Sequence, residues 1–452
     1  MNHNKNIIIF LLILVVNTIH AQKSWSLDDC IAYAIHHNLE LKNFTYSQDE
    51  NQETYRQSVR SLLPSIDADA DYVKNFGRSP NPNTNVFENT EFISSDYGLN
   101  AEIDLFQGFQ KMNTIKASKF LYKASNEETL HQKYMLAFRV MSAFYDIQFM
   151  EGLLAISKTQ KEISQNNYDM VKRQIELGQM AKADLYQAES ALITDKLSVT
   201  QSENNVTGAK LRLMQEMNLT EESSISIVTT PTKPIEEVHI EIKNEDSIYN
   251  KAKDFVPILK AQELRVEAAK KQLAAVKGNL YPSLTLFGRI RSRFVDNALI
   301  EGTDETVSFR TQLKDNTGQV VGLSLRVPIS NGWSNRSRVK QQKIAKMRAE
   351  NTYEIQKQEM YQLIQQLVQE GKALKTEYQQ SYQRMEAQEL TFEIAQKRYE
   401  KGLINAIELN QSKNLFATSQ NENLQVQLRL KVNESTLDFY QGLPVFNIDK
   451  AQ

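Results

Sequence analysis

The sequence has few of the residues that interrupt helices. Its 452 residues include only 15 glycines and 9 prolines, and both types are unfavourable inside a helix. A single cysteine, Cys30, excludes a framework of intrachain disulfide bonds. The net charge of −2 argues against a nucleic-acid partner, because such a partner requires a basic surface. We therefore expect long helices in a chain of ordinary globular composition.

Long hydrophobic runs are absent beyond the N-terminus. The apolar run at the N-terminus, Ile7–Val16, follows Lys5 and is too short for a helix that spans a bilayer. Ala21 is a small residue before a plausible cleavage point. We interpret residues 1–21 as a secretory signal peptide, with a single membrane anchor as the alternative. With a mean hydropathy of −0.49, the mature chain can span a membrane only with strands.

Motifs for catalysis or metal binding are also missing. The sequence has no His, Cys and Asp cluster with metal-ligand spacing, no phosphate-binding loop and no nucleophile elbow. We therefore expect no enzymatic activity, no cofactor and no metal ion.

Several landmarks of the sequence occur twice in the same order. A proline-containing corner and two glycines return 218 or 224 residues later. This self-similarity predicts a duplicated structural unit. The matching pairs are Leu63-Pro64-Ser65 with Tyr281-Pro282-Ser283, Gly108 with Gly332, and Gly178 with Gly402. We expect the first repeat at residues 22–219, a connector at 220–245, the second repeat at 246–442 and a C-terminal tail at 443–452.

Each repeat contains two stretches in which apolar and polar residues alternate. A period of two predicts strands, which we expect at about 65–76, 92–106, 283–295 and 318–330. Strands of about ten residues cross a bilayer when tilted, so the pattern favours a membrane barrel with a polar lumen. Two half-buried hairpins in a soluble domain are the alternative. Phe287 interrupts the alternation. The expected lumen residues, partly paired across strands, are Asp67, Asp69, Asp71, Glu102, Asp104, Arg289, Arg291, Arg293 and Arg326.

Apolar residues recur every seven positions in the rest of each repeat. The run from Phe149 to Leu177 and the run from Tyr378 to Tyr399 are examples. Such a repeat predicts coiled-coil packing. We expect long helical hairpins at about 109–217 and 333–441, which turn at Gly178 and Gly402.

The predicted fold class is mainly α with membrane β. Each repeat is a helix, two strands and a long helical hairpin. Four strands per chain leave open edges that lipid does not tolerate, so the chain is expected to oligomerise. Three copies would supply the twelve strands of a β-barrel on a long coiled-coil α-barrel.

These features together resemble the TolC-type outer-membrane efflux family. Ser26–Lys42 is similar to the first helix of that family, and the proline corners are similar to its helix-to-strand corners. Val327–Gly332 is similar to its strand-to-helix corner, and Arg398–Gly402 to its hairpin turn. The resemblance implies a homotrimer in the outer membrane of a Gram-negative bacterium, with a helical tunnel in the periplasm. It also implies a periplasmic adaptor and an inner-membrane transporter as partners, together with outer-membrane lipid.

The resemblance implies roles for residues near the hairpin turns. In the family, acids that follow the turn glycine constrict the pore, and Asp184 and Glu408 each stand six positions after their glycine. A ring of carboxylates in a narrow pore favours the passage of cations. Mutual repulsion also raises the pKa values of the carboxyl groups in the ring. Acids on solvated helix faces are the ordinary alternative. Tyr399, three positions before Gly402, is expected to join the closing contacts.

Two other positions depart from the best-known member of the family. Gln411 stands where that member has a further acid, with Gln187 as its counterpart in the first repeat, and Ile404 replaces an arginine. We therefore expect fewer charges at the closed tip. Phe109 and Trp333 directly follow strands and suit an aromatic girdle at the periplasmic membrane surface.

The sequence thus favours a passive exit duct of a tripartite efflux pump. An exit duct for protein secretion and a periplasmic coiled-coil scaffold without a pore remain as alternatives. The exported substrate cannot be read from the chain.

Overall fold

The computed structural model describes residues 24–81, 84–220, 223–228, 244–446 and 448. The predicted signal peptide and most of the predicted connector lie outside these residues. The chain divides into two compact units, which we describe separately. A helical unit comprises Met1–Tyr46, Glu127–Lys260 and Ile355–Gln452, and a sheet unit comprises Ser47–Asn126 and Ala261–Glu354.

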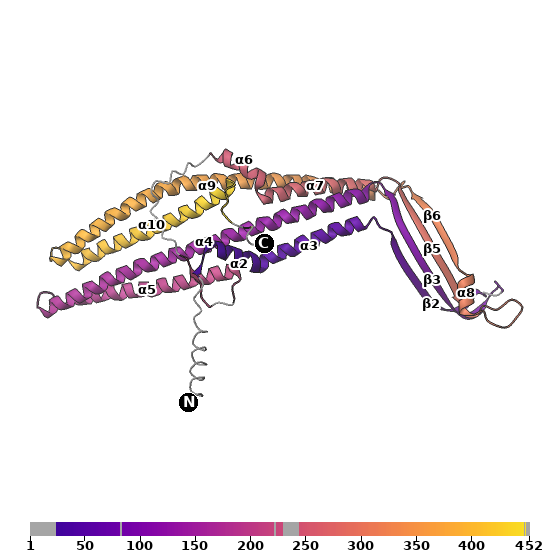
Figure 1. Cartoon of the computed structure of the whole chain (residues 1–452), viewed down its shortest axis with the longest axis horizontal. Helices are drawn as coiled ribbons and strands as arrows, with labels where there is room; N and C mark the ends of the chain where they lie inside the picture. Colours follow the sequence, from indigo (N-terminus) through magenta and orange to yellow (C-terminus); the bar gives the residue numbers. More distant parts are fainter. Residues whose placement is uncertain (1–23, 82–83, 221–222, 229–243, 447, 449–452) are drawn as a thin grey trace, which may run out of the picture. The chain divides into compact units, whose positions relative to one another are not determined.

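The described residues are mainly helical, with few strands (Figure 1). Two helices, two long strands and two long helices follow one another in the first half of the chain, and the second half has the same order with the additional short helix α8 between its strands. In chain order the elements are β1 (Ser24–Trp25), α2 (Leu27–His37), α3 (Leu39–Arg60), β2 (Ser65–Pro80), β3 (Phe87–Gln107), α4 (Gln110–Glu176), α5 (Lys182–Met217), β4 (Ser226–Ile227), α6 (Glu245–Phe255), α7 (Pro257–Gly278), β5 (Ser283–Val295), α8 (Phe309–Asp315), β6 (Gly318–Arg326), α9 (Ser334–Glu400) and α10 (Ala406–Tyr440).

Local sequence signals set several of the helix boundaries. The Ser26 hydroxyl accepts a hydrogen bond from the Asp29 N–H (3.1 Å), and the Asp29 carboxylate accepts one from the Ser26 N–H (3.3 Å). This reciprocal pair, a capping box, starts α2. Helix α6 ends before Val256 and α7 begins at Pro257, because the residue before a proline avoids helical geometry and proline fits the first helical position.

The four long strands form one antiparallel sheet in the order β2-β3-β5-β6. The pairing of β2 with β3 runs from Ser65 opposite Glu102 to Pro80 opposite Phe87. A bulge at Asp104 shifts the register between β3 and β5. Strands β2 and β6 are the edges of the sheet.

The ends of the strands differ from the ranges expected from sequence. Strand β2 continues to Pro80 and β3 begins at Phe87, because cross-strand pairing continues through the less regular part of the sequence. Strand β6 ends at Arg326, two residues before Pro328, which has no N–H group for a neighbouring strand.

A short helix that the sequence analysis did not predict, α8, lies between β5 and β6. The Gln312 side chain of α8 is buried, and it donates to the Val295 carbonyl (2.8 Å) and accepts from the Val295 N–H (2.9 Å). The Phe309 ring packs edge-on against the Phe294 ring, with centroids 5.1 Å apart. These contacts fix α8 against β5.

In the helical unit, α4 pairs with α5 and α9 pairs with α10 as two antiparallel hairpins (Figure 1). The Ser157 and Ser202 hydroxyls lie 3.0 Å apart between α4 and α5. The Ser381 hydroxyl of α9 donates to the Asn423 side chain of α10 (3.1 Å). Helix α4 also contacts α10, since a Cβ atom on Gly152 would lie 2.5 Å from a Leu424 methyl group. The two hairpins therefore pack directly on each other.

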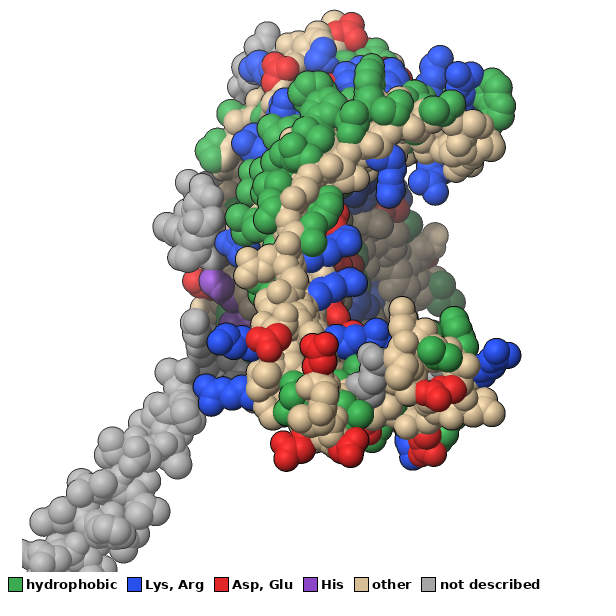
Figure 2. Space-filling model, turned by 90° about the vertical axis from the view of Figure 1, so that its right-hand side faces the viewer, with side chains coloured by type: hydrophobic (Ala, Val, Ile, Leu, Met, Phe, Trp, Pro, Cys, Tyr) green, Lys and Arg blue, Asp and Glu red, His purple; other side chains and the backbone are tan. Residues whose placement is uncertain are grey.

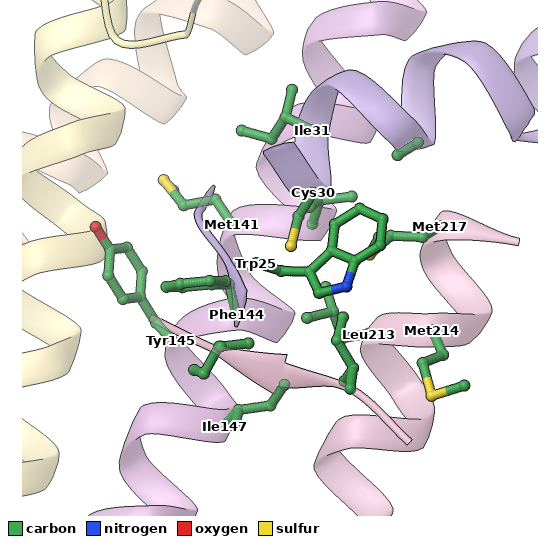
Figure 3. Packing of buried hydrophobic residues seen from close by; sticks show 14 of the residues in the cluster. Trp25, Cys30, Ile31, Met141, Phe144, Tyr145, Ile147, Leu213, Met214 and Met217 are labelled. Atoms are coloured by element: carbon green, nitrogen blue, oxygen red, sulfur yellow. The ribbon is translucent and has the colours of Figure 1, made fainter. Parts of the chain in front are cut away.

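The N-terminal residues anchor the largest apolar core of the helical unit. Strand β1 pairs in parallel with β4 and places Trp25 in this core. Figure 3 shows the Trp25 ring among Cys30, Leu213 and Met217, which are all buried. Full burial of one large apolar side chain contributes about 1.5–3 kcal/mol. This core therefore fastens α2, α4 and α5 together.

Across the described residues, we find no helix with both the length and the apolar character needed to cross a membrane.

Candidate functional site

Both helical hairpins turn through the same backbone motif. Gly178 and Gly402 each have φ +73°, the left-handed conformation that glycine adopts most easily. The Gly402 N–H donates to the Tyr399 carbonyl and the Leu403 N–H donates to the Arg398 carbonyl, both at 2.9 Å. The first turn has the equivalent pair of bonds. This is the Schellman arrangement, in which a left-handed residue ends a helix and satisfies its last carbonyls. We call residues 177–181 the first tip and residues 401–405 the second tip.

The two acids that were singled out from the sequence lie in the first turns of α5 and α10. The Asn405 side chain accepts from the Glu408 N–H (2.9 Å) and donates to the Glu408 carboxylate (3.1 Å). The Asp184 carboxylate accepts from the Ala181 N–H (3.2 Å). Acids at this position stabilise helix N-termini. Both acids thus have a local structural role that the sequence analysis did not assign. Glu408 is exposed and Asp184 is half-buried.

Tyr399 lies in an apolar cluster that joins the two hairpins near the tips. The cluster includes Val171 of α4, Ala188 of α5 and Phe416 of α10, with Ile404 packed at its edge. The Tyr399 hydroxyl is buried and has no hydrogen-bond partner among the described residues. Burial, and secondarily the charge of Asp184, raise the pKa of this hydroxyl. The structure therefore brings Tyr399 and Asp184 near each other, while Ile404 contributes to the apolar cluster.

Gln187 and Gln411 line a groove between α5 and α10. The groove has a volume of about 900 Å³, and Asp195 and Lys413 also line it. Both glutamines are exposed. They therefore face this groove, whereas Asp184 is not among the residues that line it. Asp195 and Lys413 were not candidates from the sequence.

In the sheet unit, the register places all of the candidate lumen residues on one face. Side chains directly opposite each other in adjacent strands share a face. Asp69, Gly98, Arg291 and Gly318 form one such row, and the candidates on the other rows follow with the same alternation. The rows that complete the set join Asp67, Asn100 and Arg289; Asp71, Asp96 and Arg293; Glu102 and Phe287; Asp104 and Thr285; and Ser283 and Arg326.

Polar contacts on this face are partly cross-strand, but they rarely join the expected acids to the expected arginines. The Asn100 side chain donates to Asp67 (2.9 Å) and to Asp69 (2.8 Å). Arg293 forms an ion pair with Asp96 (3.6 Å). The alternation of β3 already placed Asn100 on the polar face, and Asp96 lies on the same face, although neither was among the candidate lumen residues.

Phe287, which interrupts the alternation, also has a structural explanation. A Cβ atom on Gly322 would lie 2.7 Å from the Phe287 ring, so this ring covers the space that the glycine leaves open. The Arg289 guanidinium lies 5.0 Å from the centre of the same ring, within range of a cation–π interaction. The aromatic side chain is thus accommodated on the polar face.

The opposite face of the sheet is apolar and exposed. Ile66, Tyr72, Val321, Leu323 and Leu325 each have an exposed fraction between 63% and 80%. Figure 2 views the chain from the end where the sheet lies, and it shows hydrophobic side chains gathered along one surface, with Lys and Arg side chains along another. A large exposed apolar surface indicates a membrane or protein contact.

Phe109 and Trp333 lie at the corners where strands lead into helices. Both have φ +62°, a left-handed conformation that is strained for an aromatic residue. Their exposed fractions are 66% and 67%. The Arg336 guanidinium lies 4.4 Å from the centre of the Trp333 ring. The corners thus hold two aromatic rings out toward the surroundings.

Within the part of the chain that the structure describes, no group of three or more His, Cys, Asp and Glu residues is arranged to hold a metal ion.

Comparison with known proteins decides the family. The sequence matches the outer membrane efflux protein family over residues 31–219 and 248–443. The chain belongs to this family. The resemblance that was drawn from motifs alone is therefore confirmed, and with it the outer-membrane location.

Relatives of this family are distant in sequence. Outer membrane protein TolC of Vibrio cholerae serotype O1 is 21% identical over 317 residues, which are 70% of this chain and 67% of that protein. Toxin and drug export protein A of Aggregatibacter actinomycetemcomitans is 20% identical over 200 residues, which are 44% of this chain and 43% of that protein.

The fold is shared with solved outer-membrane channels. The Campylobacter jejuni CmeC outer membrane channel superposes with a TM-score of 0.79, covering 94% of this chain and 89% of that chain, at 15% sequence identity. At this identity the likeness concerns the fold. It supports a mainly helical efflux-channel fold with few strands.

Proposed function

We propose that the protein is the passive exit duct of a tripartite efflux pump. The observation that carries this proposal is the four-stranded sheet, which is polar on one face, apolar and exposed on the other, and open at both edges. In a membrane the backbone groups of an open edge need partners. Three copies joined edge to edge would supply twelve strands and close a barrel with its apolar face toward lipid.

In this proposal the polar face of the sheet lines a water-filled lumen. The predicted aspartates and arginines keep the lumen hydrated, and Asn100 and Asp96 are additional lining residues. Phe109 and Trp333 form the aromatic girdle at the periplasmic membrane surface. Three copies of the two helical hairpins enclose a tunnel, at whose tips an adaptor and an inner-membrane transporter dock. Catalysis has no part in this function.

The tips form the gate of the proposed duct. Glu408 is exposed next to the second tip, and three copies of it would place carboxylates around a narrow opening. Asp184 and Tyr399 lie between the two hairpins, where they border the gate. Gln187 and Gln411 face the groove between α5 and α10. Because glutamine is uncharged, this gate carries fewer charges than the resemblance alone implies.

Export of a protein is the second candidate. One relative is named toxin and drug export protein A, so its name includes both a toxin and drugs as cargo. The same duct geometry would suit either cargo. A cargo-free measurement on the duct tests the shared part of both candidates.

The duct is tested by reconstituting the purified protein into a planar bilayer. We expect heat-modifiable oligomers and discrete conductance steps that favour cations. A chain that forms neither would be a periplasmic scaffold without a pore.

The gate is tested with Glu408→Gln. Glutamine at this position still accepts a hydrogen bond from Asn405, so the substitution removes the charge and retains the cap. We expect cation selectivity to fall. Glu393→Gln, at an exposed position of α9, is the matched control and should leave selectivity unchanged. Equal selectivity in wild type and Glu408→Gln would remove Glu408 from the gate.

A further inference from the structure

The two helical hairpins are joined by a buried charge. Among the described residues, Lys413 is the one Lys, Arg, Asp or Glu side chain that is fully buried, with 3% of the residue exposed. Its ammonium group donates to the Asp195 carboxylate (2.5 Å) and to the Ser164 hydroxyl (2.7 Å). The same hydroxyl donates to the Asp195 carboxylate (2.5 Å). A buried ion pair needs such additional hydrogen bonds to offset the loss of water.

The three residues come from three helices and from both hairpins. Ser164 is on α4 and Asp195 is on α5, which form the first hairpin, whereas Lys413 is on α10 of the second hairpin. The exposed ion pairs differ in this respect. Arg384 and Glu422, for example, join α9 to α10 within one hairpin.

Several buried polar atoms on the helices that hold this ion pair have no hydrogen-bond partner among the described residues. On α4, both polar atoms of the Gln160 side chain and the Asn167 side-chain oxygen are buried without a hydrogen-bond partner among the described residues. On α10, the same holds for the Ser412 hydroxyl and the Gln420 side-chain oxygen. Each such atom favours separation of the surfaces that bury it, because water would satisfy it. The ion pair therefore lies in a polar band between the apolar cluster at the tips and the core around Trp25.

We propose that Lys413, Asp195 and Ser164 form a latch that holds the two hairpins of one protomer together, and that the latch opens when the hairpins separate. The use of the latch as a gate rests on the proposed function; its existence does not. Asp195 and Lys413 border the groove between α5 and α10, so water can reach both charges once they part. Rehydration then stabilises the separated state, and the interface has two alternatives, paired or hydrated.

The latch is tested by measuring the distance between the hairpins with pairs of spin labels. The labels are placed at Glu189 on α5 and Glu393 on α9, which are both exposed, in the full chain with the buried Cys30 replaced by alanine. The variants are Lys413→Met and the doubly neutral Lys413→Met with Asp195→Asn. Arg384→Met is the matched control, because it removes an exposed ion pair within one hairpin.

The wild type and Arg384→Met should give one narrow distance distribution. Both latch variants should show a second population at longer distance. The ratio of separated to paired hairpins should be about tenfold or more above its small wild-type value, as expected for the loss of a hydrogen bond to a charged group. The double variant leaves no unpaired buried charge, so it keeps the test valid if Lys413→Met alone fails to assemble. A narrow, wild-type distribution in the double variant would overturn the latch. Absence of conductance from the wild type would overturn the duct, and the distances would still decide the latch.

Discussion

The second tip offers a clean test of how the hairpins end. In Gly402→Ala, the new Cβ atom meets no atom within 4 Å. The substitution therefore changes neither packing nor a side-chain contact. Only the backbone conformation is affected, because Gly402 has φ +73°. Alanine in a left-handed conformation is less favourable by about 1–2 kcal/mol.

This free energy should appear as local opening of the tip rather than as global unfolding. The reporters are the Gly402 and Leu403 amides, which donate to Tyr399 and Arg398 in the native turn. A loss of about 1–2 kcal/mol corresponds to hydrogen exchange that is about 5- to 30-fold faster. Hydrogen exchange measured by mass spectrometry on tip peptides gives this ratio directly. Gly178→Ala should have the same effect at the first tip.

Gly208→Ala is the matched control. Its new Cβ atom also meets nothing within 4 Å, but Gly208 lies inside α5 with an ordinary helical backbone. Alanine is favoured over glycine there by about 0.5–1 kcal/mol, so exchange at neighbouring amides should slow by up to about fivefold. The reasoning would be refuted if Gly402→Ala left exchange at the tip unchanged, or if Gly208→Ala accelerated exchange as Gly402→Ala does.

Two further outcomes follow from single side chains. Trp25 is buried (4%) and Trp333 is exposed (67%). In vesicles with brominated lipids, the fluorescence of Trp25→Phe, which retains Trp333, should be strongly quenched, and that of Trp333→Phe should not. Equal quenching in both variants would place the Trp333 corner outside the bilayer. Burial, and then the charge of the aspartate one turn later, raise the pKa of Glu434. Its carboxyl group therefore binds protons more tightly in the folded than in the unfolded chain, and stability falls as pH rises through the raised pKa. Denaturant midpoints between about pH 4 and about pH 8 should decline less for Glu434→Gln than for wild type, and parallel profiles would contradict this assignment.

The mainly helical fold with few strands could be read from the sequence because both periods are strong. Alternation in β5, for example, puts Arg289, Arg291 and Arg293 on one side whatever that strand pairs with. Which residues stand directly opposite each other in neighbouring strands could not be predicted, because that depends on the register of the pairing. The observed pairing of Asp69 with Gly98 and of Gly98 with Arg291, for example, separates these two charged residues by one strand. The bulge at Asp104 shows why register is not a matter of counting residues.

The sequence contained a signal for each charged residue of the latch, but not for their pairing. Lys413 lies four positions after Leu409 and three before Phe416, which is a place for an apolar residue in a seven-residue repeat. A lysine there requires a buried partner. Asp195 has a similar place, three positions after Leu192 and four before Val199, but it could not be identified as that partner because it lies in the other hairpin. Long-range packing of two coiled coils is what brings them together.

The two tips share one turn motif, yet their helices begin differently. Asn405 caps α10 with its side chain, whereas Ala181 has no side-chain group to cap α5. Replacement of a capping side chain by alanine weakens a helix start by about 1 kcal/mol. The Asp184 carboxylate, which accepts from the Ala181 N–H, is then the main polar restraint on the start of α5. Loss of Asp184 would therefore loosen the first hairpin and also remove a charge that contributes to the raised pKa of Tyr399. An acid at this position stabilises the fold of the tip whether or not it takes part in a gate. Its role in conductance can therefore be judged only from substitutions that keep the cap.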